Sequence, residues 1–305
     1  LASKHRIDLG LGDWCPPRWS QRLAQRFSST AYYLQEAKTL ALFARHLGDF
    51  EKASELSALA DAIGQAINED FYHGDGLYAK GELTASALAL AFNFAPQGEK
   101  EKVLSGLVKQ ARAARHTAQF GILGAKWVPR VLAENGHIDD ALAFFTQPSE
   151  PGWANWVRQG ATSLWENWDG TNSQCHIMFG DFAAWAVRYL GGIAASETDP
   201  GFCHPRLKPL IPRALEAVNA ECRGIRLAWR KKGLHELEIT VQLPPGVSGV
   251  LELPDGTERK ISGHGSQKVL THCLYDMETF KLDSQFPRTS KVDSAAKAAL
   301  EKIQV

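Results

Sequence analysis

The chain has 305 residues, of which 44% are apolar and 22% charged, proportions that are ordinary for a globular protein with at least one sizeable core. Its 34 basic and 34 acidic residues balance, so we expect neither nucleic acid nor an anionic membrane as a partner. The apolar runs are too short to span a bilayer, and the five scattered cysteines contain no CxxC pair, which argues against a zinc site or a disulfide framework.

From residue 29 to about residue 193 the apolar residues recur with the period of a helix. The first two helices, with apolar stripes over 34–44 and 56–67, are separated by a tight reversal at Gly48-Asp49-Phe50. Further helices are expected over 85–94, 103–114, 121–133, 138–145 and 182–189. Pro129 should kink its helix or mark an irregular turn.

Helical hairpins of this kind build either solenoids or toroidal barrels. The pairs share no repeated sequence, and the loops between them differ in length. A long, tryptophan-rich loop from residue 148 to about 174 favours the barrel, in which the loops at one end carry the site. We therefore assign residues 1–199 to a helical barrel.

Near residue 200 the pattern changes to a period of two. Ile225, Leu227 and Trp229 alternate with polar residues, and residues 237–243 do the same, which predicts an antiparallel β-sandwich over 213–275. Four prolines in residues 200–212 predict a linker. The tail over 276–305 is left unassigned, with residues 290–303 either a short amphipathic helix or frayed.

The nine tryptophans are an unusual number, and four of them, Trp153, Trp156, Trp165 and Trp168, fall within sixteen residues. An indole offers a flat apolar face and one N–H donor, which suits a sugar ring. A tryptophan-rich core is an equally good interpretation of each one. The cluster therefore points to carbohydrate binding without establishing it.

Glu166 lies between two of these indoles and is the best candidate for a catalytic residue. A carboxylate beside indole faces loses part of its solvent, a setting that suits proton transfer. Asn172 and His176 offer neutral groups that could hold sugar hydroxyls. From composition alone, Glu166 could also be a surface or ion-paired carboxylate, and His176 a core or loop histidine.

A second candidate segment is GLGDWCPP at residues 10–17. Two glycines before an acid, an indole and a Pro-Pro pair indicate a rigid, irregular loop. Asp13 and Trp14 are therefore either sugar contacts or, in the case of Asp13, a turn-forming residue near a helix.

Several of these segments, in this order, resemble the C-terminal part of the family 78 glycoside hydrolases, the bacterial and fungal α-L-rhamnosidases. The resemblance covers roughly residues 9–255, and its most specific motifs are GATSLWENWDG and HIMFGD. The family usually has a second threonine where this chain has Ser163. The matching segments are GLGDWCPP (10–17), FGILGAK (120–126), GATSLWENWDG (160–170), HIMFGDFAAW (176–185) and LKPLIP (207–212).

The resemblance implies a mainly α chain with a β domain: part of an (α/α)6 toroidal barrel followed by an antiparallel β-sandwich. It implies inverting hydrolysis of terminal α-L-rhamnose from glycosides or polysaccharides, with no metal or other cofactor. Glu166 matches the general base that activates water. Asp13, Trp14, Trp165 and His176 match positions that line the rhamnose pocket, and Trp168 joins them as a candidate sugar contact.

Inversion also needs a general acid. In the family this acid lies on an Asp-Cys-Pro-rich loop that we do not find here, and about eight barrel helices are expected here against twelve in the family. With no initiator methionine or signal peptide, we interpret the chain as part of a longer protein or a truncated relative, and leave its localisation and oligomeric state open. The alternatives are a non-catalytic carbohydrate-binding or structural fragment and a barrel glycosidase acting on another sugar.

Overall fold

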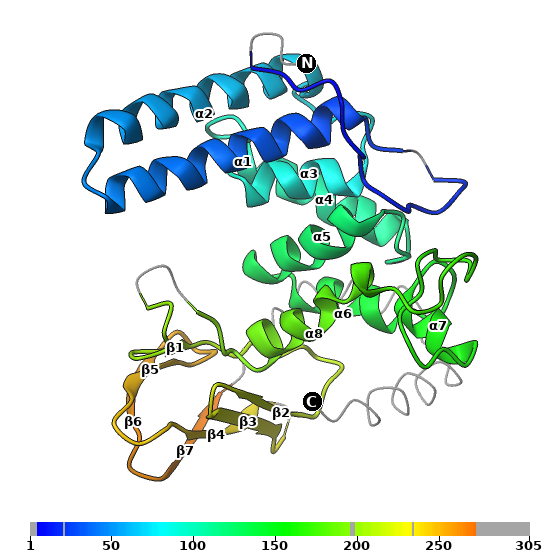
Figure 1. Cartoon of the computed structure of the whole chain (residues 1–305). Coiled ribbons are helices and arrows are strands. Elements are labelled where there is room, and N and C mark those ends of the chain that lie inside the picture. The colour runs from blue at the N-terminus through cyan, green and yellow to red at the C-terminus, as the bar shows by residue number, and fades with distance from the viewer. Residues whose placement is uncertain (1–4, 21, 196–198, 234, 273–305) are drawn as a thin grey trace. The chain divides into compact units, whose positions relative to one another are not determined.

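The computed structural model describes residues 5–20, 22–195, 199–233 and 235–272 (Figure 1). The chain divides into two compact units, the first ending at Phe179 and the second beginning at Gly180. The unassigned tail over 276–305 and the expected helix at 290–303 lie outside the described residues, as does Cys273.

The first unit is built from helices joined as antiparallel hairpins, of which α1 and α2 are the longest (Figure 1). Contacts run from α1 to α3 to α5 and from α4 to α6, which gives the two-layered arrangement of a helical barrel. None of the helices in the described ranges is long and apolar enough to cross a membrane. The helices are α1 (Gln25–His46), α2 (Phe50–Phe71), α3 (Leu83–Ala91), α4 (Lys100–Ala113), α5 (Ile122–Glu134), α6 (Ile138–Thr146), α7 (Trp153–Arg158) and the short 3-10 helix η1 (Ile177–Phe179).

The apolar stripes locate the core of this unit. Phe27 and Leu34 of α1 and Ile63 of α2 are almost fully buried, and the Phe27 ring makes an edge contact with Tyr78 at 6.1 Å. Asp49 caps α2 by accepting a hydrogen bond from the Lys52 N–H at 2.9 Å, as expected for the reversal at that point. The helical periodicity therefore locates the hairpins correctly.

Helix α1 is apolar on a second face as well. Leu40, Phe43 and Leu47 are 52%, 57% and 85% exposed, and Phe50 at the start of α2 is 69% exposed. Large apolar side chains grouped on one helix face are unusual on a free protein surface. Within the described ranges no segment covers this face of α1.

Two details of the first unit differ from the sequence-based expectations. Helix α5 contains Pro129 and runs on to Glu134 as one continuous α-helix, without an irregular turn at the proline. The region predicted as one long loop contains α7, whose six residues are too few to show a helical period.

The second unit begins with α8 (Asp181–Trp185), which continues as the π-helical turn η2 (Ala186–Leu190), and then forms two sheets. One sheet has the order β1-β5-β6 and the other β2-β3-β4-β7. Leu237, Ile239 and Val241 of β4 are buried and alternate with more exposed residues, as the period of two predicts. The strands are β1 (Arg206–Leu207), β2 (Ala217–Cys222), β3 (Ile225–Lys231), β4 (Glu236–Gln242), β5 (Ser248–Glu252), β6 (Glu258–Ser262) and β7 (Ser266–His272).

The segment predicted as a linker is partly incorporated into a sheet. Arg206–Leu207 form β1, which pairs with β5 in parallel, whereas the other strand pairs are antiparallel. The Trp229 indole N–H donates to the Leu190 carbonyl oxygen at 2.8 Å and so fastens β3 to the end of η2. The described structure is therefore mainly helical, with a β-sandwich after the helices.

Asp140 holds α6 to α4. Its carboxylate accepts two hydrogen bonds from the Arg112 guanidinium, at 2.9 and 2.8 Å, and lies 2.8 Å from His116 Nε2. Burial alone would raise the pKa of Asp140, but its hydrogen bonds to His116, His137 and Arg112 outweigh burial and hold that pKa well below its usual range.

We expect Asp140→Asn to lower the free energy of unfolding by about 3 kcal/mol at pH 7, because the neutral amide no longer supplies the partly buried negative charge that the Arg112 guanidinium contacts. The folded-state pKa of Asp140 is depressed, so its contribution is complete above the unfolded pKa of about 4 and is lost as the pH falls further. Urea unfolding at a series of pH values measures both effects. Asp61→Asn, an exposed position on α2, is the matched control.

Candidate active site

Asp13 is bound to the start of helix α5. Its Oδ1 accepts hydrogen bonds from the backbone N–H groups of Leu123 (2.7 Å) and Gly124 (3.3 Å). Its Oδ2 accepts from the Gly121 N–H at 2.9 Å and from the Thr84 hydroxyl at 2.6 Å. The first N–H groups of a helix lack partners within the helix and carry its positive dipole end, so a carboxylate is well placed there.

The GLGDWCPP segment and the FGILGAK segment meet here, with their backbones in close contact. A Cβ at Gly121 would lie 2.6 Å from the Asp13 carbonyl oxygen, so only glycine allows the backbones to approach. The Ile122 N–H also donates to the Trp14 carbonyl oxygen at 2.9 Å. Burial raises the pKa of Asp13, while its four hydrogen bonds oppose that rise.

Three of the clustered tryptophans form a core beneath the loops. Trp156 and Trp168 stack with ring centroids 4.8 Å apart, and Trp153 meets Trp168 edge to face at 4.9 Å. Each indole N–H donates to a backbone carbonyl oxygen: Trp153 to Phe179, Trp156 to Trp168, and Trp168 to Phe120. These bonds fix the loop after α7 to the helices.

The loop that carries Glu166 folds back on itself. The Glu166 N–H donates to the Ser173 carbonyl oxygen at 2.8 Å, and the His176 N–H to that of Leu164 at 2.8 Å. Gly170 makes the turn with a positive φ of 74°, and a Cβ there would lie 2.8 Å from the Trp165 ring. The turn thus depends on glycine both for its backbone angle and for space.

The Glu166 side chain is held by its own loop and remains partly exposed. Its Oε2 accepts a hydrogen bond from the Ser173 N–H at 3.2 Å and lies 3.7 Å from His176 Nδ1. The side chain is 21% exposed. No hydrogen bond occupies Oε1 within the described residues, so one oxygen is available for a water or a ligand.

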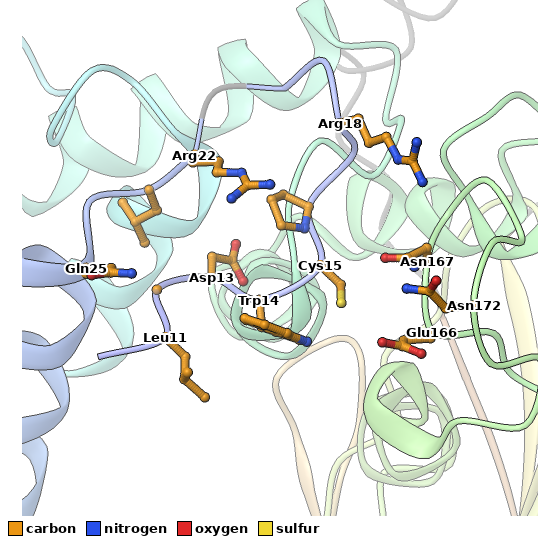
Figure 2. A pocket seen from close by; sticks show the side chains of 13 residues that line it. Leu11, Asp13, Trp14, Cys15, Arg18, Arg22, Gln25, Glu166, Asn167 and Asn172 are labelled. Atoms are coloured by element: carbon orange, nitrogen blue, oxygen red, sulfur yellow. The ribbon is translucent and has the colours of Figure 1, made fainter. Parts of the chain in front are cut away.

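Glu166 lines a pocket of about 380 Å³. Figure 2 shows Glu166, Asn167 and Asn172 on one wall, facing Asp13, Trp14, Cys15, Arg18 and Arg22 on the other. Trp14 is 44% exposed, whereas Asp13 is 7% exposed. The pocket thus offers carboxylate, amide, guanidinium and indole groups to a small polar ligand.

The predicted site residues divide into two groups. Glu166, Asp13 and Trp14 line the pocket, whereas Trp165, Trp168 and His176 are not among its lining residues. Trp165 is 7% and Trp168 2% exposed. Direct sugar contacts by the residues of the second group stay predictions.

Sequence reasoning did not single out the thiol and guanidinium groups of the pocket. Cys15 lay within a motif already noted, but Arg18 and Arg22 belong to no pattern. Burial raises the pKa of the Cys15 thiol, the negative charge of Glu166 raises it further, and the positive charge of Arg22 lowers it. The Cys15 thiol is therefore close enough to Glu166 and to Arg22 for the charge of each to affect its pKa. Among the described residues, no group of three or more His, Cys, Asp or Glu side chains is arranged to hold a metal ion.

Comparison with known proteins places the chain in a family of glycosidases. The sequence profile of the bacterial α-L-rhamnosidase six-hairpin glycosidase domain matches residues 2–190, and that of the bacterial α-L-rhamnosidase C-terminal domain matches residues 192–268. The first match alone covers more than half of the chain. The chain therefore belongs to the bacterial α-L-rhamnosidase family.

Individual relatives agree with this assignment. An α-L-rhamnosidase from Formosa agariphila is 30% identical over 261 residues, which are 77% of this chain and 27% of the relative. One from Streptomyces avermitilis is 25% identical over 84% of this chain and 26% of the relative. The chain thus spans about a quarter of the length of these curated relatives.

Solved structures show the same fold. The α-L-rhamnosidase of Aspergillus terreus has a TM-score of 0.80 at 20% identity, covering 88% of this chain and 33% of the other. The Streptomyces avermitilis enzyme, complexed with L-rhamnose, has a TM-score of 0.75 at 21% identity and covers 89% of this chain and 28% of the other.

We expect Asp13→Asn to lower the free energy of unfolding by about 2 kcal/mol. The four donors now share two carboxylate oxygens, whereas the asparagine side chain offers them a single acceptor oxygen. Urea denaturation followed by circular dichroism measures the change. Asp8→Asn, at an exposed position of the same segment, should have a much smaller effect. Full stability of Asp13→Asn combined with loss of L-rhamnose binding would instead make Asp13 chiefly a sugar ligand.

Proposed function

We propose that the first unit of this chain supplies the water-activating part of an α-L-rhamnosidase site, with Glu166 as the general base. The main support is the position of Glu166 in the pocket. Its own loop holds one carboxylate oxygen, and the other oxygen is available to a water molecule. A base must hold its proton-accepting oxygen in a fixed position while leaving it open to water. Glu166 meets both conditions.

The groups that line the pocket suit a neutral sugar. Trp14 supplies a half-exposed indole face, and Asn167 and Asn172 supply amides that can donate to and accept from hydroxyl groups. We propose that Trp14 touches the rhamnose ring directly. Trp165 and Trp168 would act by holding the Glu166 loop, and His176 by its position beside the Glu166 carboxylate.

Inversion of configuration requires a second carboxyl group, an acid about 6.5–9.5 Å from the base across the sugar. Among the described residues that line the pocket, the other carboxylate is Asp13. Both oxygens of Asp13 already accept hydrogen bonds from the start of α5 and from Thr84, so Asp13 is poorly suited to deliver a proton to a leaving group. We infer that the general acid lies on polypeptide outside residues 1–305.

The uncovered face of α1 supports this inference. Leu40, Phe43 and Leu47 form an apolar surface of the kind that another helical hairpin of the same barrel would bury. The relatives are also nearly four times as long as the part matched here. We propose that the rest of the barrel covers this face and carries the acid.

The test is Glu166→Gln in the polypeptide that carries the complete barrel, assayed on an aryl α-L-rhamnoside. We expect kcat to fall about 10³-fold, because the amide cannot accept a proton from water. Calorimetry with L-rhamnose should show that the variant still binds the sugar. Glu150→Gln, at an exposed position close by in the chain, is the matched control and should keep full activity.

Three results would contradict parts of the proposal. Unchanged turnover in Glu166→Gln would remove Glu166 from the mechanism. Binding of rhamnose without any product from the complete polypeptide would favour a carbohydrate-binding module. Hydrolysis of a different aryl glycoside in preference to the rhamnoside would change the sugar while keeping the mechanism.

A further inference from the structure

A second pocket, of about 430 Å³, lies in the β-sandwich unit, on the sheet formed by β1, β5 and β6 (Figure 1). Its lining residues belong to β5, to β6 and to the segment that leads into β1. None of them lines the pocket that contains Glu166. The second unit therefore has a cavity of its own, to which the proposed rhamnosidase function assigns no role.

The pairing of β5 with β6 places four of the lining side chains on one face of the sheet. Ser248 pairs with Ser262, and Val250 pairs with Lys260. Side chains alternate between the two faces along a strand, so these four share the face opposite to that of Leu251, which is fully buried. The pocket face thus presents two hydroxyl groups, one ammonium group and a small apolar surface.

His204 joins this face from the segment before β1. Its N–H donates to Asp199 Oδ2 at 2.7 Å, and its ring Nδ1 lies 3.4 Å from the Ser248 carbonyl oxygen. The Val250 N–H donates to the Pro205 carbonyl oxygen at 3.0 Å and holds the segment against β5. With the proton on Nδ1, that nitrogen donates to the carbonyl oxygen and Nε2 remains as an acceptor. The imidazole is thus fixed at the pocket with one nitrogen to offer.

The other charges on this sheet are paired, whereas the polar groups of the pocket are not. Arg206 donates to Glu258 Oε1 at 2.7 Å, and Lys208 forms an ion pair with Glu252. Within the described ranges, Lys260 has no hydrogen-bond or ion-pair partner, and neither serine hydroxyl of the pocket has one. No carboxylate lines the pocket. Its donors are therefore available to a ligand.

The spacing of these groups matches a sugar ring better than a small anion. Lys260 and Ser262 lie two residues apart on β6, which separates them by about 6–7 Å along the strand. Ser248 and Ser262 face each other across the strand pair, about 5 Å apart. The oxygens of one carboxylate or sulfate lie much closer together, whereas the hydroxyl groups around a pyranose ring are spread over such distances. Val250 lies among the donors, where it can meet the apolar face of the ring.

We propose that this pocket is a non-catalytic saccharide site. It holds one pyranose unit of a carbohydrate chain, with the apolar face of the ring on Val250 and its hydroxyl groups bonded to His204, Lys260 and the two serines. The inference goes beyond the proposed function, since neither Glu166 nor any other residue of the first pocket takes part. A site that contacts one sugar unit binds weakly, so a polymer offering many such units is the ligand with which binding is best detected.

Affinity electrophoresis of the 305-residue chain tests the proposal. The chain is run in native gels that contain an α-L-rhamnan, a neutral β-glucan or a neutral galactan, and its retardation is measured against a gel without polymer. We expect one or more of the polymers to retard the chain. Ser262→Trp, which fills the pocket, should abolish the retardation. Lys260→Ala, which removes one donor, should weaken the affinity about fivefold.

Two matched variants control for the changes in charge and bulk. Arg259→Ala removes a positive charge one residue before Lys260, and His264→Trp adds an indole two residues after Ser262. Both positions are exposed and outside the pocket, so neither variant should change the retardation. Trp14→Ala, which alters the first pocket, should leave it unchanged as well. Circular dichroism checks that each variant is folded.

The proposal is overturned if none of the three polymers retards the chain, or if the retardation survives Ser262→Trp. Loss of retardation on addition of sodium sulfate at constant ionic strength would also overturn it, because the pocket would then be an anion site. The rhamnosidase function is tested separately. In the polypeptide that carries the complete barrel, Ser262→Trp should leave kcat/KM for a small aryl α-L-rhamnoside unchanged, whereas Glu166→Gln should lower it.

Discussion

The candidate site depends on the first residues of helix α5, because both walls of the pocket are fastened there. Asp13 of one wall accepts hydrogen bonds from the N–H groups of Gly121 and Leu123. The loop of the other wall is tied to the residue just before, since the Trp168 indole donates to the Phe120 carbonyl oxygen. The backbone from Phe120 to Leu123 thus donates N–H groups to the wall that carries Asp13 and offers a carbonyl oxygen to the wall that carries Glu166. This shared attachment sets the position of Glu166 relative to Trp14.

The same arrangement explains how a tryptophan-rich segment can serve a polar site. The indoles of Trp156 and Trp168 are buried and bonded to backbone oxygens, so they stiffen the loop. Glu166, between Trp165 and Trp168 in the chain, is left facing the pocket. The buried neighbours and the hydrogen bond from the Ser173 N–H together restrict the orientation of the carboxylate, as the role proposed for it requires.

Much of this could be predicted from the sequence where elements are long or residues lie close together in the chain. The helices α1 to α6 each span several turns, so their apolar periodicity is evident, whereas α7 and the two-residue strand β1 are too short to have one. The partners of Asp13 could not be predicted, because Gly121 and Thr84 lie far from it in sequence and nothing local indicates the contact. Arg22 likewise could not be predicted as a pocket residue, because no local sequence pattern contains it and only the fold brings it to the pocket.

The link between Arg18 and the Asp169 turn joins the two pocket walls at an exposed position, where the Arg18 side chain is 76% and that of Asp169 33% accessible. An ion pair at such a place contributes about 0–1 kcal/mol and is of the order of thermal energy. Each wall is already fastened to the same stretch of backbone at the start of α5, so the loss of this bridge would leave those anchors in place. This bridge therefore adds little to the separation of the two walls, which is set by the hydrogen bonds deeper in the structure at Gly121 and Phe120.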